Sequence, residues 1–130
     1  MSYMQPRIKS FKCGSDLSAK QFTFVKFGSD DETIVPCTVA DEKSIGVLMN
    51  APDFSVGEFA EVALPGGGAK LKASGVIPRG SYISSAVTSG QAKVAAPGSG
   101  LHSHVGAIAH ATSATNDIIS VELVAFDLIG

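Results

Sequence analysis

The chain has 130 residues, enough for one domain with its own hydrophobic core, and its formal net charge is −2. A hydrophobic content of 45% against 17% charged residues excludes intrinsic disorder. With so small a net charge and scattered Lys and Arg residues, the chain has no field that would attract nucleic acid or an anionic membrane surface. We therefore predict no nucleic-acid and no membrane partner.

Composition also indicates the structural class. Fourteen Gly, six Pro and seven Phe without any Trp are typical of short strands joined by many turns. No apolar run approaches the roughly 18 residues of a membrane span, and the first residues, MSYMQPRIKSFK, lack the apolar stretch of a secretory signal. We expect a protein made in the cytoplasm, in which Cys13 and Cys37 are reduced thiols; a disulfide or a shared metal is the less favoured alternative.

Residues 1–20 differ from the rest of the chain. Basic Arg7, Lys9 and Lys12 alternate with apolar Ile8 and Phe11. The segment is predicted to be an N-terminal arm, either ordered against another surface or frayed. The stretch 16–20 could form at most one turn of helix.

The first run of strands begins at residue 22. The segment QFTFVKF carries large side chains on both faces, which predicts a strand buried on both sides or at a subunit contact. A polar turn at 28–32 leads into a return strand, and Pro36 places that strand at an edge or a bulge. A strand over 45–50, a loop and an alternating strand over 58–64 complete this run.

A second run follows the breaker at 65–68. Strands are predicted over 69–77, 81–87, 92–96, 105–111 and 118–126, with a flexible connection at 97–104. Strands recur roughly every 8–12 residues, the spacing of a sandwich or barrel, and no segment has the length and period of a helix. We predict an all-β fold: a compact small β-barrel or sandwich (tulip-like) with an extended N-terminal arm.

The two runs repeat one plan. The predicted pseudo-repeats span about 22–64 and 80–124 of a single barrel domain, residues 21–130. The matches are Phe24–Phe27 with Tyr82–Ser85, Thr33–Val35 with Ala92–Val94, Gly46 with Gly106, Ala51 with Ala111, Val62 with Val121 and Leu64 with Leu123. A Gly inside a strand marks a bulge, a bend or a close backbone approach. Because no reactive side chain recurs, what is repeated is a scaffold.

Three histidines, His102, His104 and His110, are the candidates for metal ligands, since strand alternation would place them on one face. The segment is loop-like and contains no Asp or Glu, so a solvated or subunit-facing loop is favoured over a metal site. The acidic clusters at 30–32 and 41–42 are predicted to be solvated turns.

No catalytic motif is present. The chain has no G-x-S-x-G elbow; the serines Ser44, Ser84, Ser85 and Ser103 have no evident His and Asp companions, and Cys37 has no basic neighbour. We predict no catalytic, cofactor-binding or metal-binding residues, and a protein that is not an enzyme.

One family matches the order of these pieces. The segments IGVLMNAP, VGEFAEVAL, GGAKLKAS, AKVAAP, VGAIAHATS and IISVEL, within about residues 22–125, resemble the small β-rich head decoration (cement) proteins of tailed bacteriophages. The resemblance implies a non-enzymatic virion protein that binds the outer surface of the mature capsid as a homotrimer and stabilises it. Its partners would be the major capsid protein and itself.

The arm, residues 1–20, is longer and more basic than the leaders of that family. Arg7, Ile8, Lys9, Phe11 and Lys12 would suit an acidic surface with apolar dimples, and His102 and His104 are further candidate contacts with the capsid or a subunit. Another virion appendage, a tail or fibre module that binds glycans or proteins, is the alternative. The absence of Trp counts against glycan binding, because glycan sites present aromatic platforms.

Overall fold

Strands make up nearly all the regular structure of the protein. The computed structural model describes residues 5–86, 90–97 and 99–129. In these ranges it contains one turn of 3₁₀ helix, η1 (Phe54–Val56), and the strands β1 (Arg7–Cys13), β2 (Phe24–Phe27), β3 (Thr33–Pro36), β4 (Gly46–Leu48), β5 (Ala60–Leu64), β6 (Gly68–Lys72), β7 (Tyr82–Ser85), β8 (Ala92–Val94), β9 (His102–Ala109) and β10 (Ile118–Ile129). The predicted all-β barrel fold is confirmed. No helix in the described ranges is long and apolar enough to cross a membrane.

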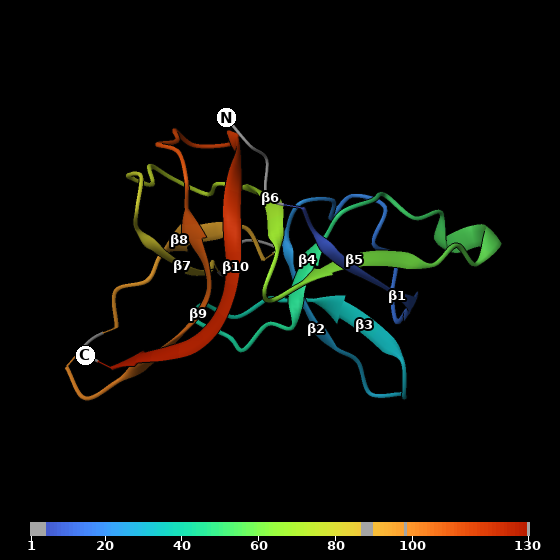
Figure 1. The fold of residues 1–130 in the computed structure, drawn as a ribbon. Coiled ribbons are helices and arrows are strands. Elements are labelled where there is room, and N and C mark those ends of the chain that lie inside the picture. Colours follow the sequence, from blue (N-terminus) through green and yellow to red (C-terminus); the bar gives the residue numbers. More distant parts are fainter. Residues whose placement is uncertain (1–4, 87–89, 98, 130) are drawn as a thin grey trace.

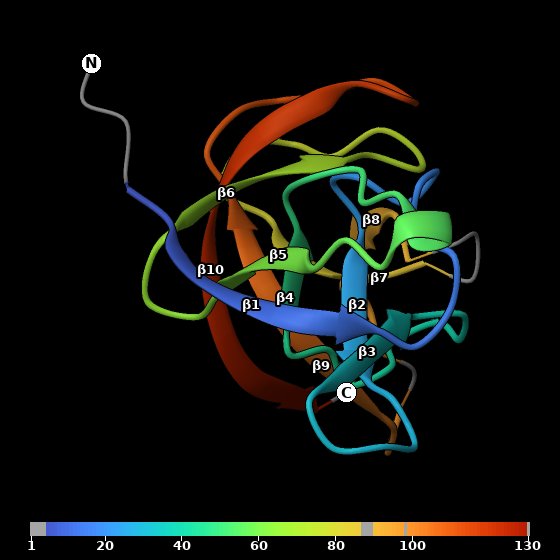
Figure 2. The same ribbon diagram turned by 90° about the vertical axis from the view of Figure 1, so that its right-hand side faces the viewer.

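The first five strands close into a barrel, in the order β1-β3-β2-β4-β5 (Figures 1 and 2). β1 completes it by pairing antiparallel with β5, where Phe11 faces Ala60, and parallel with β3, where Cys13 faces Ile34. Parallel pairing of β1 with β3 joins strands far apart in sequence, as closing a barrel requires.

The predicted arm is therefore in large part a strand. Residues 7–13 belong to the barrel and residues 1–4 lie outside the described ranges. The one turn of helix considered for residues 16–20 is wrong. This stretch is a turn closed by the Lys20 N–H on the Leu17 carbonyl, with the Asp16 carboxylate accepting from the Ser18 N–H. That carboxylate contact holds the chain in a turn instead of a helix.

The second half repeats the strand order of the first. Its sheet runs β6-β10-β9-β7-β8, and the barrel, read from β1 through β5, runs β1-β5-β4-β2-β3. The predicted pseudo-repeats, 22–64 and 80–124, thus correspond to four strands of each unit, and β1 and β6, which the prediction leaves outside the repeats, are the fifth. Figure 1 shows the two units side by side. The second sheet comes close to closing as well, through one parallel bridge between Ala73 and Ala92.

The ladders correct the alignment of two strands. Val25 pairs with Gly46, whereas its repeat partner Ile83 pairs with Ala107. Ala107 therefore occupies the place of Gly46, and the predicted match of Gly46 with Gly106 is wrong by one residue. The match between β3 and β8 shifts by one in the same way, since Phe27 and Ser85 pair with Ile34 and Ala92.

Both glycines nevertheless mark close approaches, as predicted. A Cβ on Gly46 would collide with the Ala63 carbonyl oxygen, and one on Gly106 would lie 2.6 Å from the Phe24 ring. Gly46 thus permits tight pairing inside the barrel, and Gly106 permits contact between the two halves.

The turns repeat too. Phe22 has a φ of 66° and Gly80, at the matching place before the next strand, has a φ of 86°. Phe22 N–H donates to the Leu48 carbonyl, as Gly80 N–H donates to that of Ala109. The fold thus requires a left-handed backbone conformation at this turn in both halves. Only the second half has a glycine there, which adopts that conformation without a steric cost.

Two hydrophobic clusters form the core. Inside the barrel lie Phe11, Leu17, Val25, Ile34, Leu48, Ala60 and Val62. The other cluster fills the second sheet and includes Phe24, Cys37, Val47 and Ala63 from the first half. β2 therefore buries Val25 in the barrel and Phe24 against the second sheet, which confirms the prediction of a strand buried on both sides.

Candidate interaction surfaces

The first candidate surface follows β1. Arg7, Ile8, Lys9 and Lys12 are exposed, whereas Phe11 is 5% exposed and points into the barrel core. Arg7 is held by a hydrogen bond from Nη1 to the Pro65 carbonyl (2.7 Å), and the Lys9 ammonium lies 5.1 Å from the Phe11 ring centre. Of the five predicted contact residues on β1, four are therefore available to a partner in this structure, and Phe11 supports them from beneath.

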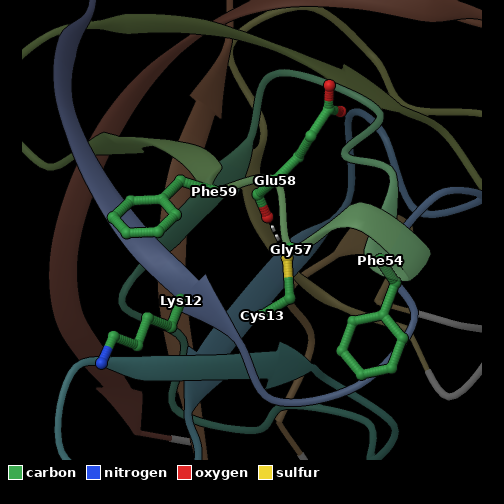
Figure 3. A pocket seen from close by; sticks show the side chains of 6 residues that line it. All are labelled: Lys12, Cys13, Phe54, Gly57, Glu58 and Phe59. Atoms are coloured by element: carbon green, nitrogen blue, oxygen red, sulfur yellow. Dashed lines mark hydrogen bonds between the residues drawn. The ribbon is translucent and has the colours of Figure 1, made fainter.

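A cavity of about 300 Å³ opens at the end of β1 (Figure 3). It is lined by Lys12, Cys13, Phe54, Gly57, Glu58 and Phe59. The rings of Phe54 and Phe59 lie on opposite sides of Cys13, and both are about half exposed. We call this site the Phe54–Phe59 groove.

The loop 53–59 builds this groove through its own hydrogen bonds. The Asp53 carboxylate accepts from the Ser55 N–H (3.0 Å), and the Asp53 N–H donates to the Glu58 carboxylate (2.7 Å). These bonds fix the single turn of η1 and hold Phe54 outward. The sequence predicts a plain loop here; the available signal was two Phe residues flanking it.

Cys13 lines the groove as a free thiol. Burial raises its pKa, and the carboxylates of Asp16 and Glu58 raise it further. Its sulfur donates to the Glu58 carbonyl at 3.4 Å. A raised pKa leaves little thiolate at neutral pH, so the polar groups of the groove are chiefly those of Lys12 and Glu58, beside two Phe rings.

The second candidate surface lies where β9 and β10 extend past the rest of their sheet. His102 is exposed there, but His104 is only 8% exposed, with Nδ1 3.3 Å from the Asp127 carboxylate. A second cavity of about 300 Å³ is lined by Lys43, His104, Ala125, Phe126 and Asp127. The rings of Tyr82 and Phe126 meet edge to face at 5.3 Å beside it.

The histidines do not come together as ligands. His110 is exposed and lies 3.3 Å from the Glu122 carboxylate, a different partner from that of His104. Among the residues that the structure describes, no three His, Cys, Asp or Glu side chains are placed to hold a metal ion.

A polar cluster lies beneath the second surface. The carboxylate of Asp41 accepts from Ser103 and pairs with the Lys93 ammonium at 2.8 Å, and the hydroxyls of Ser84 and Ser103 are 2.6 Å apart. Burial opposes ionisation of Asp41, but the bonds from Lys93 and Ser103 outweigh it and hold its pKa below the ordinary value. Ser84 and Ser103 are fully covered by the surrounding structure.

The neighbouring carboxylate has the same character. Glu42 pairs with Lys26 and accepts from the N–H groups of Thr38 and Val39, and these contacts hold its pKa below the ordinary value against the effect of burial. The prediction of solvated turns therefore fits 30–32, which are exposed, and is wrong for Asp41 and Glu42. Sequence could not reveal this, because Lys93 and Ser103 are far along the chain.

The chain matches none of the models of protein families against which it was compared, and none of the curated proteins.

Proposed function

We propose that this chain is a structural protein that attaches as a homotrimer to the outside of an assembled bacteriophage capsid and stabilises the shell. The proposal rests first on the resemblance carried by residues 22–125. Its partners in this role are the major capsid protein and further copies of itself.

One structural observation supports a binding role above others: large apolar side chains are exposed across both halves. The exposed ones are Ile8, Phe27, Val39, Phe54, Val56, Phe59, Val76, Tyr82, Val94, Leu101, Ile118, Phe126 and Ile129. Scattered exposed apolar groups are common, but here several gather at the Phe54–Phe59 groove and at the end of β9 and β10. Such surfaces suit lasting contact with other protein surfaces.

The scaffold supports the same role. A closed barrel has few free edges, and a second sheet sharing core residues with it resists deformation. A protein that braces a pressurised shell needs rigidity and wide contact areas instead of a deep pocket.

Binding to shells tests the proposal. The purified chain is mixed with precursor and with expanded capsids of the phage that encodes it, and the capsids are sedimented. We expect the chain to sediment with expanded capsids alone and to raise the temperature at which they break open. Failure to bind either form, or binding to immobilised glycans instead, would overturn the proposal.

A pair of variants locates the contact. Phe54→Ser combined with Phe59→Ser removes the apolar walls of the groove and should weaken capsid binding about tenfold or more. Val76→Ser changes an exposed apolar residue elsewhere and serves as the control. Equal binding by both variants would assign capsid contact to another surface.

A further inference from the structure

Two strand edges in the described chain are uncovered and exposed. β10 pairs with β6 only as far as Glu122, after which the Leu123 N–H donates to the Gly67 carbonyl. β9 continues alongside β10 to Ile129, with a register shift, a β-bulge or irregularity, between Leu123 and Phe126. Residues 124–129 of β10 thus have a strand neighbour on one side only.

The β10 edge is apolar with one acid. Phe126 and Ile129 are exposed, the latter by 66%, and Asp127 lies near the middle of the stretch. Ala125, just before Phe126, is exposed as well. An exposed edge of this length and composition is a site for pairing with another strand.

The β1 edge is the counterpart. Residues 7–11 pair with β5 on one side, and β3 covers the other side only from Lys12 onward. Arg7 and Lys9 are exposed along this stretch, Lys12 follows it, and Ile8 adds exposed apolar surface. Figure 2 shows β1 running across the front of the barrel, and Figure 1 shows the C-terminal end of β10 on the opposite side of the molecule.

We propose that the β10 edge of one copy, residues 124–129, pairs with the β1 edge of a second copy, residues 7–11. The two stretches have similar lengths, about 17–20 Å at roughly 3.3 Å per residue. Their charges are opposite, and because Asp127 and Lys9 both lie mid-stretch, pairing in either direction brings carboxylate and ammonium close together. Apolar Phe126, Ile129 and Ile8 would be covered at the same time.

The charges of the two edges disfavour pairing of β10 with β10 or of β1 with β1. Two β10 edges would oppose Asp127 to Asp127, and two β1 edges would oppose their cations, and like charges across a strand pair destabilise it. A contact between unlike edges is heterologous, so it repeats around a ring and closes when the rotation allows. The inference rests on the proposed function in this respect: the homotrimer is the ring that this contact would build.

Charge reversal on each edge tests the contact. Variant A carries Asp127→Lys and variant B carries Lys9→Glu; Asp31→Lys and Lys70→Glu make the same charge changes at exposed sites away from both edges. Sedimentation velocity of the full-length chain gives the assembly state. We expect the wild type and both controls to form one closed oligomer, and A and B alone to associate at least about tenfold more weakly.

Combining the two changes in one chain distinguishes the type of contact. The double variant Asp127→Lys with Lys9→Glu should associate again, because every contact of the ring then joins opposite charges at these two positions. Ala125→Lys, which leaves the Asp127–His104 contact intact, replaces variant A if circular dichroism shows that A does not fold. An oligomer unaffected by either change, an effect of only one change, or no recovery in the double variant would overturn the inference.

The outcomes separate this inference from the proposed function. If the chain binds expanded capsids but variants A and B remain oligomeric, the proposed function is supported and the edge contact is wrong. If the charge variants change the oligomer as expected but the chain does not bind capsids, the edge contact is supported and the proposed function is wrong.

Discussion

The two halves of the molecule have the same strand order but close to different extents. The barrel is sealed where β1 runs parallel to β3 over two residue pairs, Lys12–Thr33 and Cys13–Ile34. At the matching seam the second half has the single bridge between Ala73 and Ala92. The same plan thus gives a closed barrel in one half and a nearly closed sheet in the other.

The cores of the two halves also differ. In the equivalent ladders Ala92 takes the place of Ile34, at the seam, and Ala109 takes the place of Leu48. At these two positions the second half has the smaller residue, and Phe24 and Val47 of the first half contribute to its core. The barrel has a core of its own, whereas the second sheet completes its core with residues of the barrel wall.

The largest expected effect comes from removing that shared residue. Phe24→Ala should lower the free energy of unfolding by about 3–5 kcal/mol, since Phe24 is fully buried between the halves. Urea denaturation measures the loss, and amide exchange should quicken in β7 and β9 more than in β1. Phe59→Ala, at an exposed ring, should change stability by less than about 0.5 kcal/mol. Equal losses in the two variants would contradict the shared core.

Two glycine substitutions probe the same boundary. A Cβ at Gly46 meets backbone, the Ala63 carbonyl, which cannot move without breaking the β4–β5 ladder; a Cβ at Gly106 meets the Phe24 ring. Both Ala variants should be destabilised, by about 1–3 kcal/mol. Combining Gly106→Ala with Phe24→Leu should recover part of the loss, whereas Gly46→Ala with Phe24→Leu should not, as thermal denaturation of the four proteins would show. Equal recovery in both pairs would refute the assignment of Gly106 to the interface.

Much of this architecture follows from the sequence. Alternation and turn residues predict the strands and their order of recurrence, and the large side chains of both parities in QFTFVKF predict that β2 is buried on two sides. What sequence could not provide is non-local. RIKSFKC shows only Phe11 and Cys13 on its inward face, so nothing local reveals that it closes a barrel against β5.

The register of the strands and the details of the surface also could not be predicted from local sequence. Because Gly46 and Gly106 are the same residue type, the sequence aligns them, but the strand pairing aligns Gly46 with the residue after Gly106. The two glycines avoid different clashes, one with the Ala63 carbonyl and the other with the Phe24 ring. The Phe54–Phe59 groove depends on the bonds that Asp53 and Glu58 make within their loop. The partners of Asp41 are set by tertiary packing alone.

Acid should affect the contact between the two halves through the loop that carries Asp41, because its partners Lys93 and Ser103 belong to the second half. Asp41 has a pKa below its ordinary value in the folded chain, so its contribution to stability is present above the ordinary value, about 4, and is lost as pH falls through the lowered one. Asp41→Asn should cost about 1–2 kcal/mol at pH 7 and flatten the decline in stability between about pH 5 and pH 3.

The matched control for that experiment is Asp31→Asn, an exposed residue in the turn between β2 and β3. Urea midpoints of the three proteins at several pH values give the comparison. A slope in Asp41→Asn as steep as that of wild type would show that other carboxylates cause the acid sensitivity.

The smallest effect tests the repeated turn before β2 and β7. Phe22 and Gly80 share a left-handed backbone, which costs a bulky residue about 1 kcal/mol or more. Phe22→Gly should therefore be neutral or stabilising by up to about 1 kcal/mol despite the loss of a half-buried ring, whereas Gly80→Ala should destabilise by about 1 kcal/mol. A Cβ at Gly80 has no neighbour within 4 Å, so its cost would report backbone strain alone. Thermal unfolding of both variants decides whether the turn is under the same constraint in both halves; a clear loss in Phe22→Gly would mean that the ring's contacts outweigh the strain.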